Sequence, residues 1–327
     1  MKTPKEFFKD LSERCWVGAS PIRQFLMCSP FVEGMVYRSH TADEKYIMDK
    51  YEKKLGNGFD IDNPRSFTEK LQWLKLHDGK PIYSVMVDKV LAKEYVSSAV
   101  GPQYVIPTLK VWNSAREMDF SELPEQFVLK CNHNSGRGMV ICKDKSALDE
   151  KEIRKKIKKA LKRREYLVNR EWPYKNVVPK VFAEQLVSDS SVPEGQTDGL
   201  IDYKFYCFNG KPQFLYIGFA NIVNNIKHDY LSFYNLDFTP ADFGRHDHPR
   251  IPFEVKKPDN FDEMIRIAEK LAQGTLFVRV DLYNLGGEIK FSEFTFFPGG
   301  GMARFDPEEA EIRIGEMIRI DGEEDRI

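Results

Sequence analysis

The stretch FVRVDLYNLGGEIKFSEFTFFPGGG, residues 277–301, decides the fold. Apolar and polar residues alternate on both sides of Gly286-Gly287, a pattern that predicts a β-hairpin. Residues two apart on a strand share a face of the sheet. The hairpin therefore carries two same-face pairs, Arg279 with Asp281 on the first strand and Glu293 with Thr295 on the second.

The register of the hairpin depends on its turn. A two-residue turn at Gly286-Gly287 sets Asp281 opposite Ser292 and sends Glu293 to the other face, whereas an odd loop sets Asp281 opposite Glu293. We predict a loop of three or five residues, because glycines permit the positive φ that such loops use. The two carboxylates would then lie within roughly 5 Å of each other, and paired hard oxygen ligands favour Mg²⁺. The alternative is a pair of solvated acids on an exposed sheet face.

Composition and charge limit the class of protein. The chain has 327 residues, 42% of them hydrophobic, and a formal net charge of -1, which fits a soluble globular protein with no expected nucleic-acid partner. Five irregularly spaced cysteines without a CxxC pair favour a reducing cytosol over a disulfide framework. Residues 15–37 are apolar but too interrupted to span a membrane. The predicted location is cytoplasmic, with peripheral association at the inner face of the membrane left open.

A glycine-rich loop is the second informative feature. Residues 127–138, FVLKCNHNSGRG, predict a strand that leads into the loop. Backbone N–H groups at Ser135, Gly136 and Gly138 can surround phosphate oxygens, and Lys130 would supply the positive charge that phosphate requires. A plain hairpin turn is the alternative.

Two predicted helices carry much of the remaining positive charge. Residues 87–96, VDKVLAKEYV, predict a helix with Lys89 and Lys93 on one face. Residues 148–168 predict an amphipathic helix whose polar side is a basic run over residues 151–164. This run is either a solvated helix face or a contact surface for an anionic polymer or for lipid headgroups.

The order of these pieces resembles the ATP-grasp superfamily, in particular its branch associated with teichuronopeptide and capsular polysaccharide biosynthesis. The resemblance covers about residues 60–320 and rests on NPRSFTEKLQWLKLHD, FVLKCNHNSGRG, DYKFYCFNGKP and VRVDLYNLGGEIKFSEFTFFPGG. It implies an α+β fold in which two α+β subdomains clasp ATP. The implied division is a helical N-terminal region (1–98), a lid subdomain with the glycine-rich loop (99–190) and a catalytic subdomain (191–327).

The resemblance also implies roles for single residues. The implied ATP ligands are the phosphate contacts Lys89, Lys130, Ser135, Gly136 and Gly138 and the adenine contacts Glu184, Gln185 and Leu186. The implied Mg²⁺ ligands are Asp281, Glu293 and Thr295. The implied catalytic cations are Arg279, beside the transferred phosphoryl group, and Lys204, a phosphate or substrate contact. Thr295 stands where the superfamily usually has Asn, so the number of metal ions stays open.

The implied activity is that of a carboxylate-amine ligase. ATP would convert a carboxylate into an acyl phosphate, which an amine then attacks. The expected substrates are a carboxylate-bearing small molecule or surface glycan, or its precursor, and an amino acid or amine. One alternative is a sugar kinase with Asp202 or His133 as base. The other is a non-enzymatic glycan-binding or membrane-binding scaffold that uses the basic helix.

Overall fold

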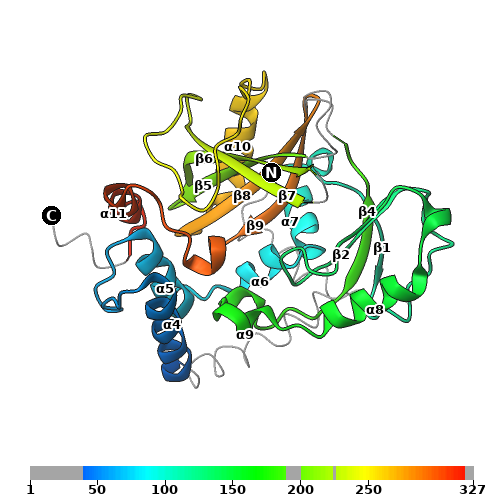
Figure 1. Cartoon of the computed structure of the whole chain (residues 1–327), viewed down its shortest axis with the longest axis horizontal. Helices are drawn as coiled ribbons and strands as arrows, with labels where there is room; N and C mark the ends of the chain where they lie inside the picture. The colour runs from blue at the N-terminus through cyan, green and yellow to red at the C-terminus, as the bar shows by residue number, and fades with distance from the viewer. Residues whose placement is uncertain (1–39, 189–199, 224–225, 321–327) are drawn as a thin grey trace.

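The computed structural model describes residues 40–188, 200–223 and 226–320 and contains two antiparallel sheets (Figure 1). The smaller sheet has the strand order β1-β4-β2-β3, and the larger has the order β7-β6-β5-β8-β9. Residues 1–39 of the predicted helical N-terminal region lie outside the described residues. The strands are β1 (Thr108–Trp112), β2 (Phe127–Cys131), β3 (Val140–Cys142), β4 (Val181–Gln185), β5 (Ile201–Phe208), β6 (Lys211–Val223), β7 (Ile226–Asn235), β8 (Phe277–Leu285) and β9 (Glu288–Thr295).

Helices cover the outer faces of both sheets and fill the space between them (Figure 1). The α-helices are α4 (His40–Leu55), α5 (Phe67–His77), α6 (Pro81–Val87), α7 (Leu91–Ala99), α8 (Glu150–Leu161), α9 (Glu165–Asn169), α10 (Phe261–Ala272) and α11 (Glu308–Glu316). Short 3-10 turns are η1 (Pro102–Tyr104), η2 (Lys145–Ala147), η3 (Trp172–Tyr174) and η4 (Pro298–Gly301). Both α6 and α7 contact β9, and they lie between the two sheets.

The larger sheet has two chemically different faces. One face packs on α10, where Phe205 lies 5.8 Å from Phe261 between ring centroids. The other face is aromatic at one end, where Phe67 of α5 packs against Tyr206 and Phe277. Along this second face the strands also carry charged side chains, and these lie toward the smaller sheet. The sheet thus provides both the main core and one wall of a candidate site.

The two sheets have separate cores. The larger core contains residues of α5, α6, α7, α10, α11 and all five strands of the larger sheet. The smaller core lies under α8, whose Ile153, Ile157 and Ala160 face β2 and its neighbours. The helices α5, α6 and α7 of the predicted N-terminal region therefore pack with the larger sheet rather than apart from it. The predicted division at residues 98 and 190 stays a prediction.

The N-terminus of α5 is fixed by a capping box. The Ser66 hydroxyl accepts from the Glu69 N–H, and the Glu69 carboxylate accepts from the Ser66 N–H at 3.0 Å. Thr68 then donates its N–H and its hydroxyl to the Glu311 carboxylate of α11, each at 2.8 Å. These bonds connect α5 to α11 at one end of the aromatic core.

The turn of the β8-β9 hairpin differs from the sequence prediction. Leu285 pairs with Glu288, so the loop has two residues, and the predicted odd loop is wrong. The predicted pairing of Asp281 with Glu293 is nevertheless present, because the register shifts between Asp281 and Leu282. Ser292 is the extra residue of this β-bulge. A bulge, rather than the turn, places the two carboxylates on one face.

Candidate active site

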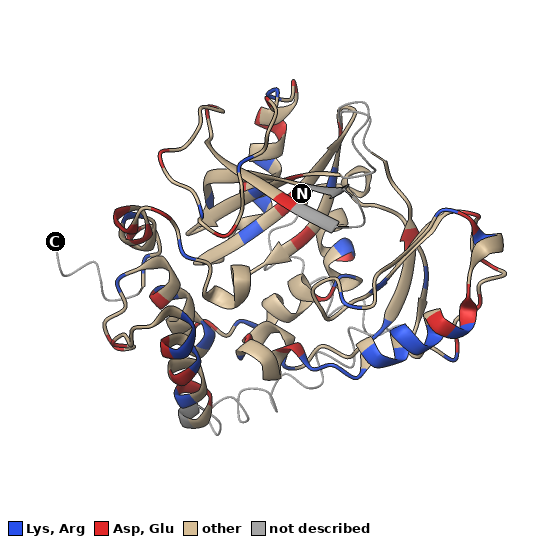
Figure 2. Ribbon diagram, in the orientation of Figure 1, with Lys and Arg blue, Asp and Glu red and all other residues tan. Residues whose placement is uncertain are grey.

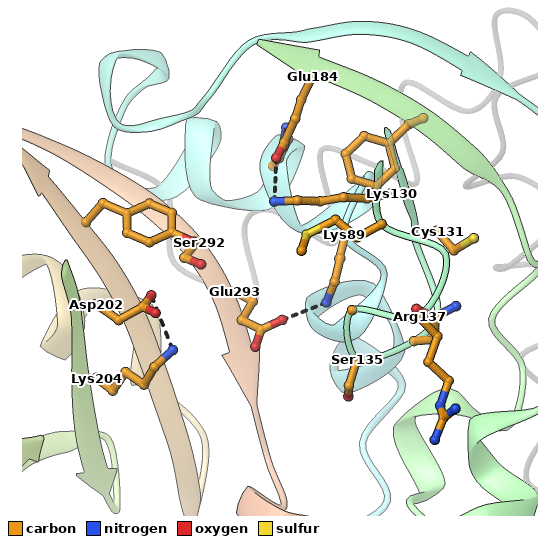
Figure 3. Close-up of a pocket in the computed structure, with 16 residues that line it drawn as sticks. Lys89, Lys130, Cys131, Ser135, Arg137, Glu184, Asp202, Lys204, Ser292 and Glu293 are labelled. Atoms are coloured by element: carbon orange, nitrogen blue, oxygen red, sulfur yellow. Dashed lines mark hydrogen bonds and ion pairs between the residues drawn. The ribbon is translucent and has the colours of Figure 1, made fainter. Parts of the chain in front are cut away.

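A cavity of about 340 Å³ lies between the glycine-rich loop and strands β5, β8 and β9 (Figure 3). This volume is in the usual range for small-molecule sites. The lining residues from the β2 and β4 side are Lys130, Cys131, Asn134, Ser135, Gly136, Arg137, Met139, Phe182 and Glu184. Those from the larger sheet are Asp202, Lys204, Tyr283, Ser292 and Glu293, and Lys89 and Lys93 complete the wall.

A charged row crosses three neighbouring strands of the larger sheet beside the cavity, which Lys204 and Glu293 line and Asp281 does not. Lys204 on β5 pairs with Asp281 on β8, which pairs in turn with Glu293 on β9. The Lys204 Nζ lies 2.8 Å from the Asp281 carboxylate and 3.3 Å from that of Asp202. The Lys89 Nζ donates to Glu293 Oε2 at 2.7 Å, as Figure 3 shows. Each acid of the row therefore has a lysine partner.

Arg279 lies beneath this row and is buried. Its Nε and Nη2 donate to the two oxygens of Asp281, each at 2.7 Å, and Nη2 also donates to the Thr295 hydroxyl at 3.0 Å. Asp281 is completely buried. None of these three side chains lines the cavity itself. In this structure Arg279 orients Asp281, so the predicted contact of Arg279 with a phosphoryl group stays a prediction.

Glu184 joins two lysines at the opposite wall. Its carboxylate is 2.5 Å from the Lys130 Nζ and 2.6 Å from the Lys93 Nζ. Burial alone would raise the pKa of Glu184, but the two lysines outweigh it and the pKa is lowered. Lys93, which the sequence analysis did not assign to the site, also donates to the Ile106 carbonyl at 2.9 Å. The signal in the sequence that could have identified Lys93 was its spacing of four residues from Lys89 in the predicted helix.

Lys89 and Lys93 do not share one helix as predicted. The helix α7 begins at Leu91, so Lys89 lies in the connection that follows α6. The Asp88 side chain accepts the N–H groups of Val90 and Leu91 at 2.9 and 3.3 Å and so orders this connection. Both lysines still reach the cavity.

The glycines of the loop have different roles. Gly136, at φ +70°, has no atom within 4 Å of a built Cβ and lines the cavity together with the exposed Ser135. Gly138, at φ +83°, is buried, and a Cβ there would lie 2.6 Å from the Cβ of Ala160. Gly138 thus lets the loop approach α8, whereas Gly136 leaves room beside the cavity. Arg137 extends away from the lysines and acids in Figure 3.

Asn134 is a cavity residue that the sequence analysis missed. Its side chain is 1% exposed, and its Nδ2 has no hydrogen-bond partner among the described residues. A buried amide donor without a partner costs free energy unless a ligand or water accepts from it. Its place in the cavity wall therefore marks a position for an acceptor oxygen.

The electrostatics of the cavity favour an ionised acid beside a protonated lysine. Burial would raise the pKa of Glu293, but Lys89 and Lys204 lower it to about 2. The pKa of Asp202 is raised, chiefly by burial and against the opposing effect of Lys204. Burial also raises the pKa of the Cys131 thiol to about 11, so this thiol is protonated and a weak nucleophile at neutral pH.

Comparison with protein families gives a match over most of the chain. The family model described as TupA-like ATP-grasp matches residues 69–319, more than three quarters of the chain. The chain belongs to the TupA-like ATP-grasp family. Its α+β architecture is therefore the ATP-grasp fold, as the sequence predicted. The predicted cofactors, ATP and Mg²⁺, are those of ATP-grasp ligases.

Solved structures of similar fold are distant from this ATP-grasp chain. The ATP-grasp ligase PsnB with a minimal precursor gives a TM-score of 0.39 at 11% identity, over 73% of this chain and 61% of PsnB. D-alanine–D-alanine ligase from Bacillus anthracis gives 0.40 at 15% identity, over 73% of this chain and 68% of the ligase. This chain thus spans less than two thirds of the length of PsnB. No curated protein matches significantly.

The hairpin acids of this ATP-grasp chain fit Mg²⁺ in their chemistry. Asp281 and Glu293 are hard oxygen donors directly opposite each other, and Mg²⁺ takes one or two carboxylates and fills its remaining positions with phosphate oxygens and water. In the described part of the chain, no group of three or more His, Cys, Asp or Glu residues could hold a metal. Thr295 accepts a hydrogen bond from Arg279. Asp281 is buried, and Arg279 and Lys204 donate to its two oxygens. The roles of Asp281, Glu293 and Thr295 as Mg²⁺ ligands therefore all stay predictions.

Other predicted residues lie outside the cavity. Gln185 and Leu186 follow Glu184 in the sequence but do not line the cavity. The Gln185 N–H donates to the Pro107 carbonyl at 3.0 Å. His133, a candidate base, is 2% exposed and its Nε2 is 3.0 Å from the Arg163 carbonyl, also away from the cavity. The adenine contacts therefore stay a prediction, and Asp202 is the stronger candidate base.

The segments considered for membrane contact give two further findings. Every helix within residues 40–188, 200–223 and 226–320 is too short or too polar to cross a membrane. The single helix predicted over residues 148–168 is divided into α8 and α9, with residues 162–164 between them.

Proposed function

We propose that this protein is an ATP- and Mg²⁺-dependent carboxylate-amine ligase that acts through an acyl phosphate. One observation carries the proposal. Lys89, Lys130 and Lys204, from three separate segments, converge on a cavity that is also lined by Glu293, whose partner on the neighbouring strand is the buried Asp281. Such a set of cations and acids suits a nucleoside triphosphate with its metal ion, and membership of the ATP-grasp family supports the choice.

The lysines and acids of the cavity neutralise one another before a ligand arrives. Lys89 pairs with Glu293, Lys130 with Glu184, and Lys204 with Asp202 and Asp281. Bound phosphates would take over the lysines of these pairs, which frees the Glu293 carboxylate. When bound, Mg²⁺ would neutralise phosphate charge. The residues of the chain would then hold the phosphates in place and keep water away from the acyl phosphate.

The bond changes need no nucleophilic side chain. A substrate carboxylate oxygen attacks the γ-phosphorus of ATP and releases ADP, and the amine then attacks the acyl carbon and releases phosphate. The protonated state of the Cys131 thiol fits this route. The proposed carboxylate belongs to a cell-surface polysaccharide or its precursor, and the amine to an amino acid or a simple amine. This assignment is supported by the TupA-like family membership.

A second candidate function is phosphoryl transfer to a sugar hydroxyl. It is favoured by Asp202, a carboxylate that lines the cavity beside Lys204 and has a raised pKa. Such a group could accept the hydroxyl proton. The two functions share one nucleotide site and differ in product.

Hydroxylamine trapping separates the two functions. Oligomeric uronic acids are incubated with enzyme, Mg-ATP and hydroxylamine, and the products are analysed by mass spectrometry. A ligase gives a hydroxamate that depends on ATP and is lost in Lys204→Met but retained in Glu122→Gln, which alters an exposed ion pair. A stable phosphate ester without hydroxamate would replace the ligase with the kinase. ATP consumption with neither product, across uronic acids and amino acids, would contradict the proposal.

A further inference from the structure

The helix α8 concentrates positive charge that the nucleotide cavity does not use. Residues 151–164 contain nine Lys or Arg and one Glu, a net charge of +8. The chain as a whole carries -1, so its other residues together carry -9. Figure 2 shows blue segments recurring along α8, separated by tan and with red near the first turn. Such segregation exceeds what a solvated helix face needs, because mixed charges would serve solubility equally well.

Four of these lysines form a straight stripe. Lys151, Lys155, Lys158 and Lys162 follow the spacing i, i+4, i+7 and i+11, which keeps them within an arc of about 60° and along about 16 Å of helix. The buried Ile153, Ile157 and Ala160 lie on the opposite side of α8. The stripe therefore points directly away from the protein.

Most of the exposed cations have no internal partner. Arg154 and Arg163 are engaged by Glu150 and Glu165, and Lys156 donates to the Met139 carbonyl. Lys155 makes only an exposed contact of 3.3 Å with Glu152. Among the Lys and Arg of residues 151–164, all of which the structure describes, those without an ion pair or hydrogen bond are Lys151, Lys158, Lys159, Lys162 and Arg164. Their charge is available to a partner.

We propose that the lysine stripe of α8 is a docking site for a linear polyanion that bears carboxylates; the choice of carboxylates rests on the substrate class proposed above. A linear partner fits this stripe, because its cations recur about every 5.5 Å along one helix. A bilayer is the poorer fit for two reasons. The apolar side of α8 is buried in the core of the smaller sheet, so it cannot insert among lipids. Acids also surround the first turn of α8, at Asp149, Glu150 and Glu152, where a flat anionic surface would be repelled.

Docking on α8 requires no nucleotide, so it can be measured separately from the ligase reaction. The proposal predicts a salt-sensitive interaction, since a polyanion releases bound counterions when lysines neutralise it. The contact would lie mainly over the C-terminal half of α8, where Lys158, Lys159 and Lys162 are exposed and the acids of the first turn are distant.

The test compares two variants of equal charge. One carries Gln in place of Lys155, Lys158 and Lys162, and the other carries Gln in place of the exposed Lys45, Lys53 and Lys54 of α4. Gln has nearly the helix propensity of Lys, so both helices should persist. Binding of fluorescently labelled poly-L-glutamate and polygalacturonate is measured by anisotropy at 50 and 200 mM NaCl without nucleotide. Vesicles of phosphatidylcholine with phosphatidylserine are tested in parallel.

The expected result is binding of the polymers by wild type at 50 mM NaCl, with at least tenfold weaker binding at 200 mM. The α8 variant should lose at least tenfold in affinity, and the α4 variant should change less than twofold. Both variants should retain the thermal stabilisation by Mg-ATP. Absence of polymer binding at 50 mM NaCl, equal losses in the two variants, or binding to vesicles without binding to polymers would each overturn the proposal.

Discussion

Replacing Glu184 with Gln should destabilise the protein more than any comparable change to an exposed acid. The Glu184 side chain is 5% exposed and neutralises Lys93 and Lys130 at 2.6 and 2.5 Å. Glu184→Gln leaves the Lys93 ammonium, 10% exposed, with neutral partners in place of a carboxylate: the Ile106 carbonyl, the Thr108 hydroxyl and the amide oxygen of the new side chain. Breaking a buried ion pair by removing one partner costs about 3–5 kcal/mol. Lys130, 26% exposed, can regain water and adds little to this cost.

The matched control is Glu122→Gln. Glu122 also pairs with a lysine of the smaller sheet, Lys110, at 2.6 Å, but both side chains are about half exposed, and such pairs are worth about 0–1 kcal/mol. Free energies of unfolding come from urea denaturation. The double variant Glu184→Gln/Lys93→Met should lose less unfolding free energy than the two single variants lose together, by at least about 1 kcal/mol. A loss below 1 kcal/mol for Glu184→Gln, or additive effects, would refute the argument.

Two other predictions follow from single residues. Gly136→Ala should lower the free energy of unfolding by about 1–2 kcal/mol, because the residue has a positive φ. Gly138→Ala should lower it by at least about 1 kcal/mol more, because its Cβ would overlap Ala160. Equal losses in urea denaturation would contradict the assigned roles. The folded-state pKa of Glu293 is about 2 against a usual value of 4.5, so its carboxylate stabilises the fold fully above about pH 4.5 and loses this effect as the pH falls toward 2. The stability difference between wild type and Glu293→Gln should shrink over that range, and a pH-independent difference would show that Glu293 is not held by its cations.

The fold could be predicted largely from local patterns. The alternation in residues 277–301 and the glycines at 286 and 287 indicated the hairpin that the structure contains. The loop length was predicted wrongly, because a turn and a bulge can give the same register and sequence alternation does not separate them. Ser292 interrupts the alternation only weakly, so the bulge left little signal.

The residues of the candidate site could be predicted where a residue type and its motif indicate one kind of chemistry. A lysine before a glycine-rich loop and acids on a hairpin suit phosphate and metal chemistry, and Lys130 and Glu293 do line the cavity. Lys93 and Asn134 were missed because their exposure to the cavity arises from packing between segments that are distant in sequence. The buried position of Arg279 could not be foreseen either, since alternation gives the face of a strand but not what covers it.

The most direct test of the central claim, that the cavity between the sheets binds Mg-ATP, is a thermal unfolding measurement with ligand. Wild type and Glu293→Gln are melted alone, with ATP and EDTA, and with Mg-ATP. A ligand at one hundred times its dissociation constant stabilises the folded state by about 2.7 kcal/mol. The account predicts a clear rise in Tm for wild type, larger with Mg²⁺ than with EDTA, and no such Mg²⁺ effect in Glu293→Gln. No rise with millimolar Mg-ATP, or the same Mg²⁺ effect in both proteins, would contradict it.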